Sequence, residues 1–263
     1  MRIPFEVVNN RRRIMGIMNL PFCFSETRIF VILCYGMNGN RVEANRLFVK
    51  EAEYLEKRGI AFVRFDYLGL GISDGDFFEA DLDTKVSDVV CVVNYIRNCC
   101  MNEKCRIVLM GISDGAKVIN KIVLEKKIDI NDIILLNPVL VLGETEHEDS
   151  GEKNTKKKVT VPIVKHPIIG KRAILKEGQF FSPKHMMQCS SDYNVFDVTN
   201  KNVVCFFSKK DDLSLLTRKK MEKVSCSIKE IDSCSHVFVE NDAQYQLFEE
   251  TYKLLSDLKG MVN

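Results

Sequence analysis

The sequence contains the pentapeptide Gly-Ile-Ser-Asp-Gly twice, at residues 71–75 and at residues 111–115. A serine between two nearby glycines is the pattern of a nucleophile elbow, a sharp turn that exposes a serine hydroxyl group for attack on a carbonyl carbon. The chemistry that this pattern indicates is acyl transfer through a serine. Because the pattern occurs twice, its residues alone do not identify the nucleophile.

The flanking residues distinguish the two copies, because an elbow needs a strand that ends at the serine and a helix that starts directly after it. The second copy follows a predicted strand at 106–110, and helical spacing of apolar residues begins at Ala116. Free amides at the start of that helix can hold an oxyanion. In the first copy the preceding strand ends at Phe65, eight residues before the serine, and no helix start follows. We therefore predict that Ser113 is the nucleophile and that Ser73 lies in a loop.

Short apolar runs alternate along the chain with longer segments whose apolar residues recur at helical spacing. Several runs have almost no polar interruption, as is typical of parallel strands buried on both faces. The alternation predicts an α/β fold with a mostly parallel central sheet and helices on both faces. The predicted strands are 29–34, 60–65, 106–110, 133–136, 203–207 and 227–231, and the apolar faces of the predicted helices lie at 47–55, 86–96, 116–123 and 247–258.

Two further regions complete the predicted organisation. Residues 5–8 and 14–18 predict an antiparallel hairpin at one edge of the sheet. From 141 to 198 no clean period appears, and an irregular segment of this length inside a compact domain is usually a functional insertion. We predict that residues 1–140 and 199–263 form the core, and that residues 141–198 form a lid or cap inserted into it.

Residues 64–75, Arg-Phe-Asp-Tyr-Leu-Gly-Leu-Gly-Ile-Ser-Asp-Gly, resemble the loop after the fourth strand of the α/β-hydrolase superfamily, and the resemblance covers nearly the whole chain. This resemblance accounts for the first pentapeptide as a structural loop. Tyr35 and Gly36 lie where that family usually has a His-Gly pair, so a tyrosine replaces the histidine. The resemblance implies an oxyanion hole made by the backbone amides of Met37 and Asp114.

In the superfamily the nucleophile is followed along the chain by the acid and then by the histidine. The resemblance implies that Asp211, in the turn after the 203–207 strand, is the acid, with the adjacent Asp212 as the alternative. It implies that His236, after the last predicted strand, is the base. The other histidines precede the acid and are expected on the surface or in the lid; they are His147, His166 and His185.

The implied reaction needs no metal and no organic cofactor. His236 takes the proton of Ser113, and Asp211 holds the imidazole in the required tautomer. Because His236 must be neutral to act as a base, activity is expected to fall below about pH 6–7.

The resemblance also gives an expectation for the substrate. The resemblance extends to compact bacterial carboxylesterases, feruloyl-type esterases and acyl thioesterases, which implies a small-molecule acyl ester or thioester, or an acyl group on a carrier. Apolar residues of the 141–198 segment either line an acyl pocket or pack against one another; they are Ile168, Ile169, Ile174, Leu175, Phe180, Phe181, Met186 and Met187.

Three function hypotheses follow. The first is a carboxylesterase or thioesterase, and the second is an acyltransferase that uses the same triad. The third is a non-catalytic hydrolase-fold protein that binds a ligand or partner. The tyrosine at position 35, where the family usually has a histidine, keeps this hypothesis open.

The composition is that of an ordinary globular protein, with 46% hydrophobic and 28% charged residues. The net charge of +2 gives no electrostatic case for nucleic acid. No apolar run approaches the roughly 20 residues of a membrane span, and residues 1–4 do not resemble a secretory signal.

The ten cysteines are irregularly spaced, which is typical of reduced thiols in a cytoplasmic protein. Cys99, Cys100 and Cys105 cluster without a nearby histidine, so no zinc site is predicted. Oligomeric state is not predicted.

Overall fold

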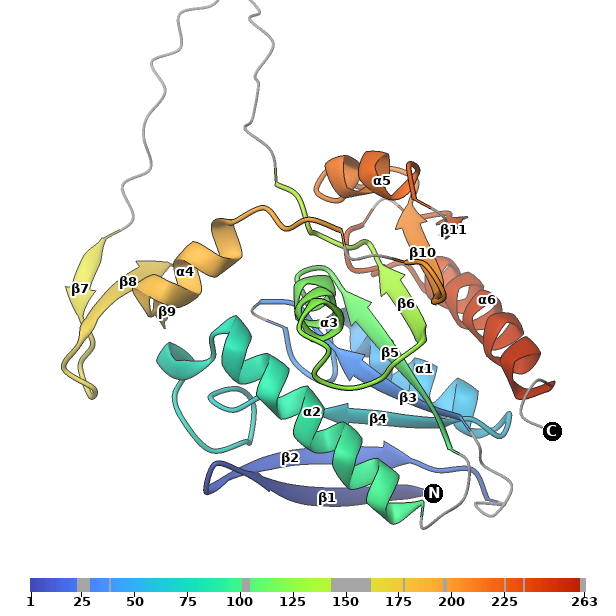
Figure 1. Ribbon diagram of the computed structural model, residues 1–263, viewed down its shortest axis with the longest axis horizontal. Coiled ribbons are helices and arrows are strands. Elements are labelled where there is room, and N and C mark those ends of the chain that lie inside the picture. Colours follow the sequence, from blue (N-terminus) through green and yellow to red (C-terminus); the bar gives the residue numbers. More distant parts are fainter. Residues whose placement is uncertain are drawn as a thin grey trace, which may run out of the picture.

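The computed structural model describes residues 1–22, 29–37, 39–100, 105–142, 162–176, 178–195, 198–224, 226–233 and 235–260. Within these residues the main sheet has eight strands in the order β1-β2-β4-β3-β5-β6-β10-β11 (Figure 1). The strands are β1 Arg2–Asn9, β2 Arg12–Asn19, β3 Ile29–Cys34, β4 Ala61–Phe65, β5 Arg106–Ile112, β6 Asp132–Leu136, β10 Asn202–Ser208 and β11 Ser227–Ile231.

Six neighbouring strands, from β4 to β11 in this order, pair in parallel, and the β1–β2 hairpin adds two antiparallel strands at the β4 edge. Every residue of β3, β4 and β6 is buried. Strands with at most one polar residue need cover on both faces, and that requirement explains their composition. The predicted α/β fold with its edge hairpin is therefore confirmed.

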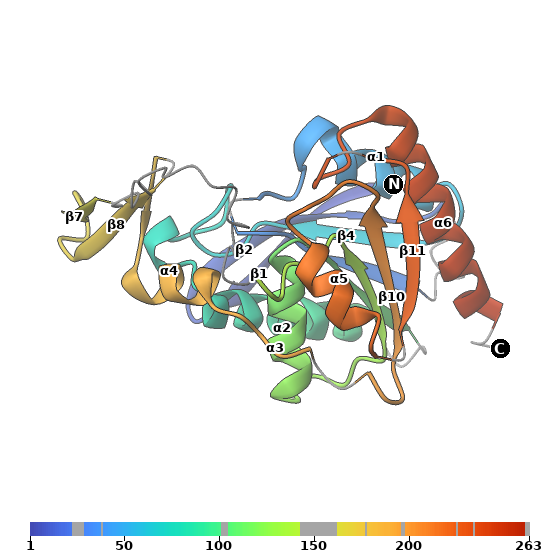
Figure 2. The same ribbon diagram turned by 90° about the horizontal axis from the view of Figure 1, so that it is seen from above.

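Helices cover both faces of the main sheet (Figure 2). Helices α1 and α6 contact each other on one face, and α2 and α3 contact each other on the opposite face. Their apolar residues are among the buried core, as the helical spacing predicts. The helices are α1 Leu47–Glu56, α2 Leu82–Cys99, α3 Gly115–Leu124, α4 Pro183–Ser190, α5 Leu215–Met221 and α6 Asn241–Gly260.

A small second sheet lies inside the 141–198 segment, beside the N-terminal end of α2 (Figure 1). Its antiparallel strands have the order β7-β8-β9, and α4 follows directly; the strands are β7 Ile163–Lys165, β8 Arg172–Lys176 and β9 Gln179–Phe181. The three strands are short and partly exposed, which is why no clean period marks them. That the whole segment acts as a lid stays a prediction.

The parallel strands end at one edge of the main sheet, and the loops after β3, β5, β6, β10 and β11 meet there. In open α/β sheets this edge is where ligands bind. None of the helices in the described ranges has the length and apolar content that crossing a membrane requires.

Candidate active site

Ser113 lies in the turn between β5 and α3, and its backbone is left-handed, with φ 55°. Residues other than glycine rarely adopt this conformation, and it costs of order 1–3 kcal/mol unless the surroundings impose it. Here hydrogen bonds impose it. The Ser113 amide donates to the Leu136 carbonyl at 3.0 Å, and the Ser113 carbonyl accepts from the amides of Ala116 and Val139, each at 3.1 Å.

The glycines on either side leave room for the turn. A Cβ on Gly115 would lie 1.9 Å from the carbonyl oxygen of Cys34, and one on Gly111 would lie 2.8 Å from the Ile119 side chain. The first contact is with backbone and cannot be relieved by a rotamer change. The strand, turn and helix predicted around the second pentapeptide are therefore present, and its glycines allow the close approach of β3 to the start of α3.

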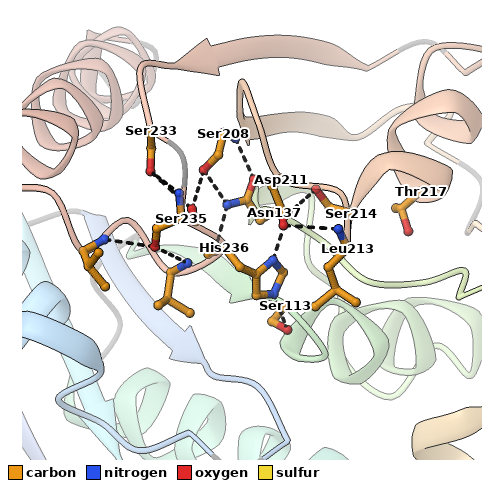
Figure 3. A network of polar contacts seen from close by, with 12 residues as sticks. Ser113, Asn137, Ser208, Asp211, Leu213, Ser214, Thr217, Ser233, Ser235 and His236 are labelled. Atoms are coloured by element: carbon orange, nitrogen blue, oxygen red, sulfur yellow. Dashed lines mark hydrogen bonds and ion pairs between the residues drawn. The ribbon is translucent and has the colours of Figure 1, made fainter.

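The structure brings Ser113, His236 and Asp211 together (Figure 3). His236 Nε2 lies 2.8 Å from Ser113 Oγ, and His236 Nδ1 lies 2.8 Å from Asp211 Oδ2. With the carboxylate accepting from Nδ1, the other ring nitrogen faces the serine hydroxyl as an acceptor. Asp212 is exposed and contributes its backbone carbonyl to Leu215, so the geometry favours Asp211 over the predicted alternative.

The Asp211 carboxylate is almost fully buried, with 4% of its side chain exposed. Burial opposes its ionisation, but hydrogen bonds from His236 and Ser214 outweigh that effect and leave the pKa of Asp211 below its usual value. The Ser214 hydroxyl donates to Oδ2 at 2.5 Å and the Leu213 amide to Oδ1 at 3.3 Å. The acid therefore stays charged beside the imidazole, as a group that orients the ring must.

Asn137 is a buried polar residue that the sequence pattern does not single out. It follows β6 directly, and its side-chain amide donates to Ser208 Oγ and to the His236 carbonyl, each at 2.8 Å (Figure 3). Its side-chain carbonyl accepts from the Ser208 amide at 2.7 Å. Asn137 thus ties the strand that precedes Asp211 to the loop that carries His236. The signal that marks it is an asparagine directly after the apolar run Ile-Ile-Leu-Leu at 133–136.

A group of serines holds the His236 loop from the other side (Figure 3). Ser208 Oγ donates to the Ser235 carbonyl at 2.8 Å. The Ser235 hydroxyl accepts from the amides of Val237 and Val239, each at 3.2 Å. Because these bonds lie on both sides of position 236 in the chain, they fix the backbone from which the imidazole extends.

The loop after β3 passes close to Ser113 at Gly36. A Cβ at this position would lie 3.2 Å from Ser113 Cβ and 3.7 Å from the Asp114 amide nitrogen. A side chain at this position would therefore crowd Ser113, and a glycine leaves the approach open. The arrangement brings the chain at Met37 next to the elbow, where the resemblance implies an oxyanion hole; the role of the two amides stays a prediction.

Tyr35 has a structural role where the family usually has a histidine. Its side chain is fully buried, its hydroxyl accepts a hydrogen bond from the Tyr67 amide at 2.9 Å, and the two rings lie 4.5 Å apart. Tyr35 therefore ties the loop after β3 to the loop after β4. This contact gives a physical reason for the departure and weakens the case that the site has lost its function.

The first pentapeptide copy forms a loop, as predicted. The Ser73 hydroxyl donates to the Asp66 carbonyl at 2.6 Å and accepts from the Met15 amide at 2.9 Å. Asp74 forms an ion pair with Arg13 at 2.9 Å. Both polar side chains of this copy are thus engaged in holding the loop against the β1–β2 hairpin.

Two of the histidines expected on the surface or in the lid, His166 and His185, lie in the 141–198 segment and are buried there. His166 and His185 are 3% and 2% exposed. His166 Nδ1 accepts from the amides of Ile168 and Ile169, and its Nε2 lies 3.2 Å from Asp76, so this ring ties the β7–β8 turn to the first pentapeptide loop. His147 lies outside the described residues.

The apolar residues of the 141–198 segment divide into two groups. Phe181 is fully buried and contacts the Phe77 ring edge-on at 4.8 Å, and partly buried side chains pack around this pair, among them Ile174, Met186 and Met37. Ile168 and Met187 are exposed. Part of the set therefore packs against Phe77 and Ala80, which lie outside the segment, and the same cluster reaches Met37 beside the elbow.

Comparison with known proteins identifies the class to which this fold and site belong. The sequence matches the family model described as "Serine aminopeptidase, S33" over residues 25–195, more than half of the 263 residues. The chain belongs to this family of α/β-hydrolases. A comparison with curated proteins found no match.

Several solved structures have a similar fold. Est1E from Butyrivibrio proteoclasticus, solved with ferulic acid bound, has a TM-score of 0.71 at 19% identity and covers 96% of this chain and 98% of that chain. GrgF, an alpha/beta hydrolase from Penicillium sp. sh18, has a TM-score of 0.66 at 14% identity over 95% and 96%. An alpha-beta serine hydrolase homologue from Coxiella burnetii has a TM-score of 0.61 at 14% identity over 96% and 97%. These likenesses establish the fold over nearly the whole chain.

Proposed function

We propose that this protein is a serine hydrolase that cleaves a carboxylic ester or thioester through an acyl-enzyme on Ser113. The observation that carries the proposal is the continuous chain of contacts from Asp211 through His236 to Ser113, with 2.8 Å at each step. The strained serine at the end of β5 and the family to which the chain belongs support it.

In the first half of the reaction, Ser113 Oγ attacks the carbonyl carbon while its proton passes to His236 Nε2. The electron pair of the carbonyl double bond moves to oxygen, and the amides of Met37 and Asp114 stabilise the resulting oxyanion, a contribution of about 3–4 kcal/mol for one such donor. The intermediate then collapses, the bond to the alcohol or thiol breaks, and the leaving group takes the proton from His236.

In the second half, water attacks the acyl-enzyme and gives one proton to His236. Collapse of this second intermediate breaks the bond to Ser113, which regains its proton as the carboxylic acid is released. The ionised Asp211 stabilises the imidazolium that forms in both halves, and its depressed pKa keeps it in the required state.

The substrate class is inferred from a similar structure and from the family description. Est1E, which has a similar fold, holds ferulic acid, a carboxylic acid of the kind that ester hydrolysis releases. The family description names an aminopeptidase, whose amide substrates need the same nucleophile and base. We favour esters and thioesters, with residues 141–198 as the cap that covers the acyl group.

A substrate panel tests the proposal. It contains p-nitrophenyl esters and acyl thioesters of graded chain length, an aminoacyl p-nitroanilide, and each ester with an added alcohol or amine acceptor. Hydrolysis of esters or thioesters by the wild type, and its loss in Ser113→Ala, is the expected result.

Other outcomes would change the proposal. Turnover of the anilide alone would reassign the protein as a peptidase, and transfer to the acceptor in preference to water would make it an acyltransferase. If no substrate is turned over and no covalent inhibitor reacts, the catalytic proposal fails and a binding protein remains.

A further inference from the structure

A small cavity opens beside the elbow, between the N-terminal ends of α2 and α3 and the helix α4. We call it the lysine pocket; its walls include Met37, Lys85, Asp114, Lys117, His185 and Gln188. Its volume of about 20 Å³ holds one or two water-sized groups. Because Met37 and Asp114 also flank the proposed oxyanion hole, the pocket adjoins the place where a substrate carbonyl would bind.

Lys85 brings a buried positive charge to this pocket. The residue is 4% exposed, and its ammonium donates to the Met37 carbonyl at 3.2 Å. An ammonium has three hydrogen-bond donors. Among the described residues this is the one hydrogen bond of Lys85, and no carboxylate there forms an ion pair with it.

The acidic groups around Lys85 are engaged elsewhere. Asp114 pairs with Lys117 at 2.9 Å, and Asp81 pairs with Lys184 at 2.7 Å. Asp88 accepts from the Leu68 amide at 2.9 Å and from Asn9 at 2.7 Å. Burial lowers the pKa of Lys85, and these more distant carboxylates partly oppose that effect. A buried ammonium with unused donors is costly unless an anion satisfies it.

His185 adds a second unsatisfied group to the same wall. It is 2% exposed, and its Nδ1 has no hydrogen-bond partner in the described part of the chain. Burial, helped by the charge of Lys85, lowers the pKa of His185 to about 3, so the ring is neutral at physiological pH. A neutral imidazole has one N–H donor, and its tautomer can turn that donor to either nitrogen.

Lys117 holds the opposite side of the pocket. Its ammonium donates to the Cys189 carbonyl at 2.7 Å and pairs with Asp114, so it is anchored between α3 and the end of α4. Since Lys117 and Asp114 neutralise each other, Lys85 is the cation that no ion pair neutralises among the described walls of the pocket; its ammonium also lies 5.5 Å from the centroid of the Tyr67 ring.

We propose that the lysine pocket binds a carboxylate of the substrate, so that the acyl group cleaved is that of a short dicarboxylic acid. The inference rests on the proposed hydrolase function. The buried cation selects an anion, the volume selects a small group over an alkyl chain, and the shared wall with Met37 and Asp114 places that group beyond the scissile carbonyl. Lys85 and His185 supply the free donors that a carboxylate accepts.

Binding tests the pocket without catalysis. Titration of the Ser113→Ala variant with glutarate and with pentanoate, which has the same five-carbon chain and one carboxylate fewer, is followed by calorimetry and by the shift in Tm. We expect glutarate to bind at least about tenfold more tightly. Lys85→Gln, which can still donate to the Met37 carbonyl but carries no charge, should remove that preference in the same background. Lys253→Gln, at an exposed position on α6 and paired with Glu250, changes the net charge equally and should leave the preference intact.

Turnover gives the second test. Monomethyl esters of succinic, glutaric and adipic acids are compared with methyl butanoate and methyl pentanoate in otherwise active enzyme. We expect kcat/KM to favour one of the carboxylate esters by at least about tenfold, and Lys85→Gln to bring that ratio close to one.

The two proposals fail in different ways. If neutral esters are hydrolysed and the carboxylate gives no advantage in either test, the lysine pocket assignment is overturned and the hydrolase stands. If glutarate binds through Lys85 but no ester is cleaved, the pocket stands and the proposed hydrolase function is lost.

Discussion

The two Gly-Ile-Ser-Asp-Gly copies have identical residues and opposite structural roles. In the 71–75 copy the glycines carry the positive φ angles, 55° at Gly71 and 101° at Gly75. In the 111–115 copy the positive φ belongs to Ser113, and the glycines instead leave space for β3 and α3. The five residues therefore do not determine the turn; the elements on either side of them do.

The contacts of the serine hydroxyl also differ between the two copies. Ser73 Oγ is held between two backbone groups of neighbouring segments, so it is a structural contact. Ser113 Oγ faces the imidazole of His236, with its own backbone fixed by hydrogen bonds to the strand end and the helix start. One copy uses its hydroxyl to hold a loop, and the other leaves its hydroxyl available for chemistry.

The largest expected effect comes from replacing each serine by alanine. Ser113→Ala should lower kcat for a hydrolysed ester by roughly 10⁴–10⁶-fold, because it removes the nucleophile of a unit whose members act together. Ser73→Ala should keep kcat within about threefold, while losing about 1–2 kcal/mol of stability with its two hydrogen bonds. Steady-state kinetics and urea unfolding measure the two. An equal loss of kcat in both variants would contradict the claim that the two copies have different roles.

Replacing an aspartate in each region by asparagine should give the next largest difference. Asp211→Asn should lower kcat by roughly 10³–10⁴-fold, since an amide next to Nδ1 favours the wrong imidazole tautomer. Asp74→Asn removes an exposed pair with Arg13 and should leave kcat and KM unchanged. Full activity of Asp211→Asn with loss in Asp212→Asn would show that the acid is misassigned.

Replacing a residue that contacts or positions each copy should give a smaller difference in kcat between the two regions. Asn137→Ala should lower kcat by roughly 10–100-fold with little change in KM, because a small displacement of the His236 loop misplaces the base. Arg13→Ala is the matched change beside the first copy and should leave kcat unaltered. To separate positioning from simple destabilisation, kcat is measured well below the Tm of each variant; if Asn137→Ala loses stability alone, the positioning role is wrong.

The smallest effect concerns acid stability. Because the folded-state pKa of Asp211 lies below its usual value, its ionised form stabilises the fold above about pH 4, and this contribution is lost as the pH falls through the folded-state pKa. The Tm of Asp211→Asn should therefore fall less steeply than that of the wild type between pH 5 and pH 3, by a few degrees. Parallel Tm curves would mean that Asp211 is not held in its charged form.

Much of the fold could be predicted because its signals are local. The strand β3 is a continuous apolar run, β4 and β6 each contain a single polar residue, and the faces of α1, α2, α3 and α6 repeat at helical spacing. The strand–turn–helix context of Ser113 is local too, which is why the two pentapeptides could be separated without coordinates. Asp211 and His236 needed the family's order along the chain.

What could not be predicted depends on contacts between distant segments. Asn137 acts on residues 71 and 99 positions away, and nothing in its neighbourhood shows where those strands end in space. From the sequence, Lys85 is a charged residue on an amphipathic helix and is expected at the surface. Its burial depends on α4, which lies on the other side of the pocket and is distant in the sequence. The strands β7, β8 and β9 are three to five residues long and partly exposed. Their sequences therefore lack the regular alternation of apolar and polar residues that would predict a strand.

Covalent labelling tests the central claim most directly, because trypsin separates the two copies. The second pentapeptide falls in the peptide 107–117 and the first in the peptide 65–85. After reaction with a fluorophosphonate and digestion, mass spectrometry should find the added phosphonyl group on peptide 107–117, at Ser113, and no label in Ser113→Ala. Label on peptide 65–85, or equal labelling of the wild type and Ser113→Ala, would contradict the assignment of Ser113 as the nucleophile.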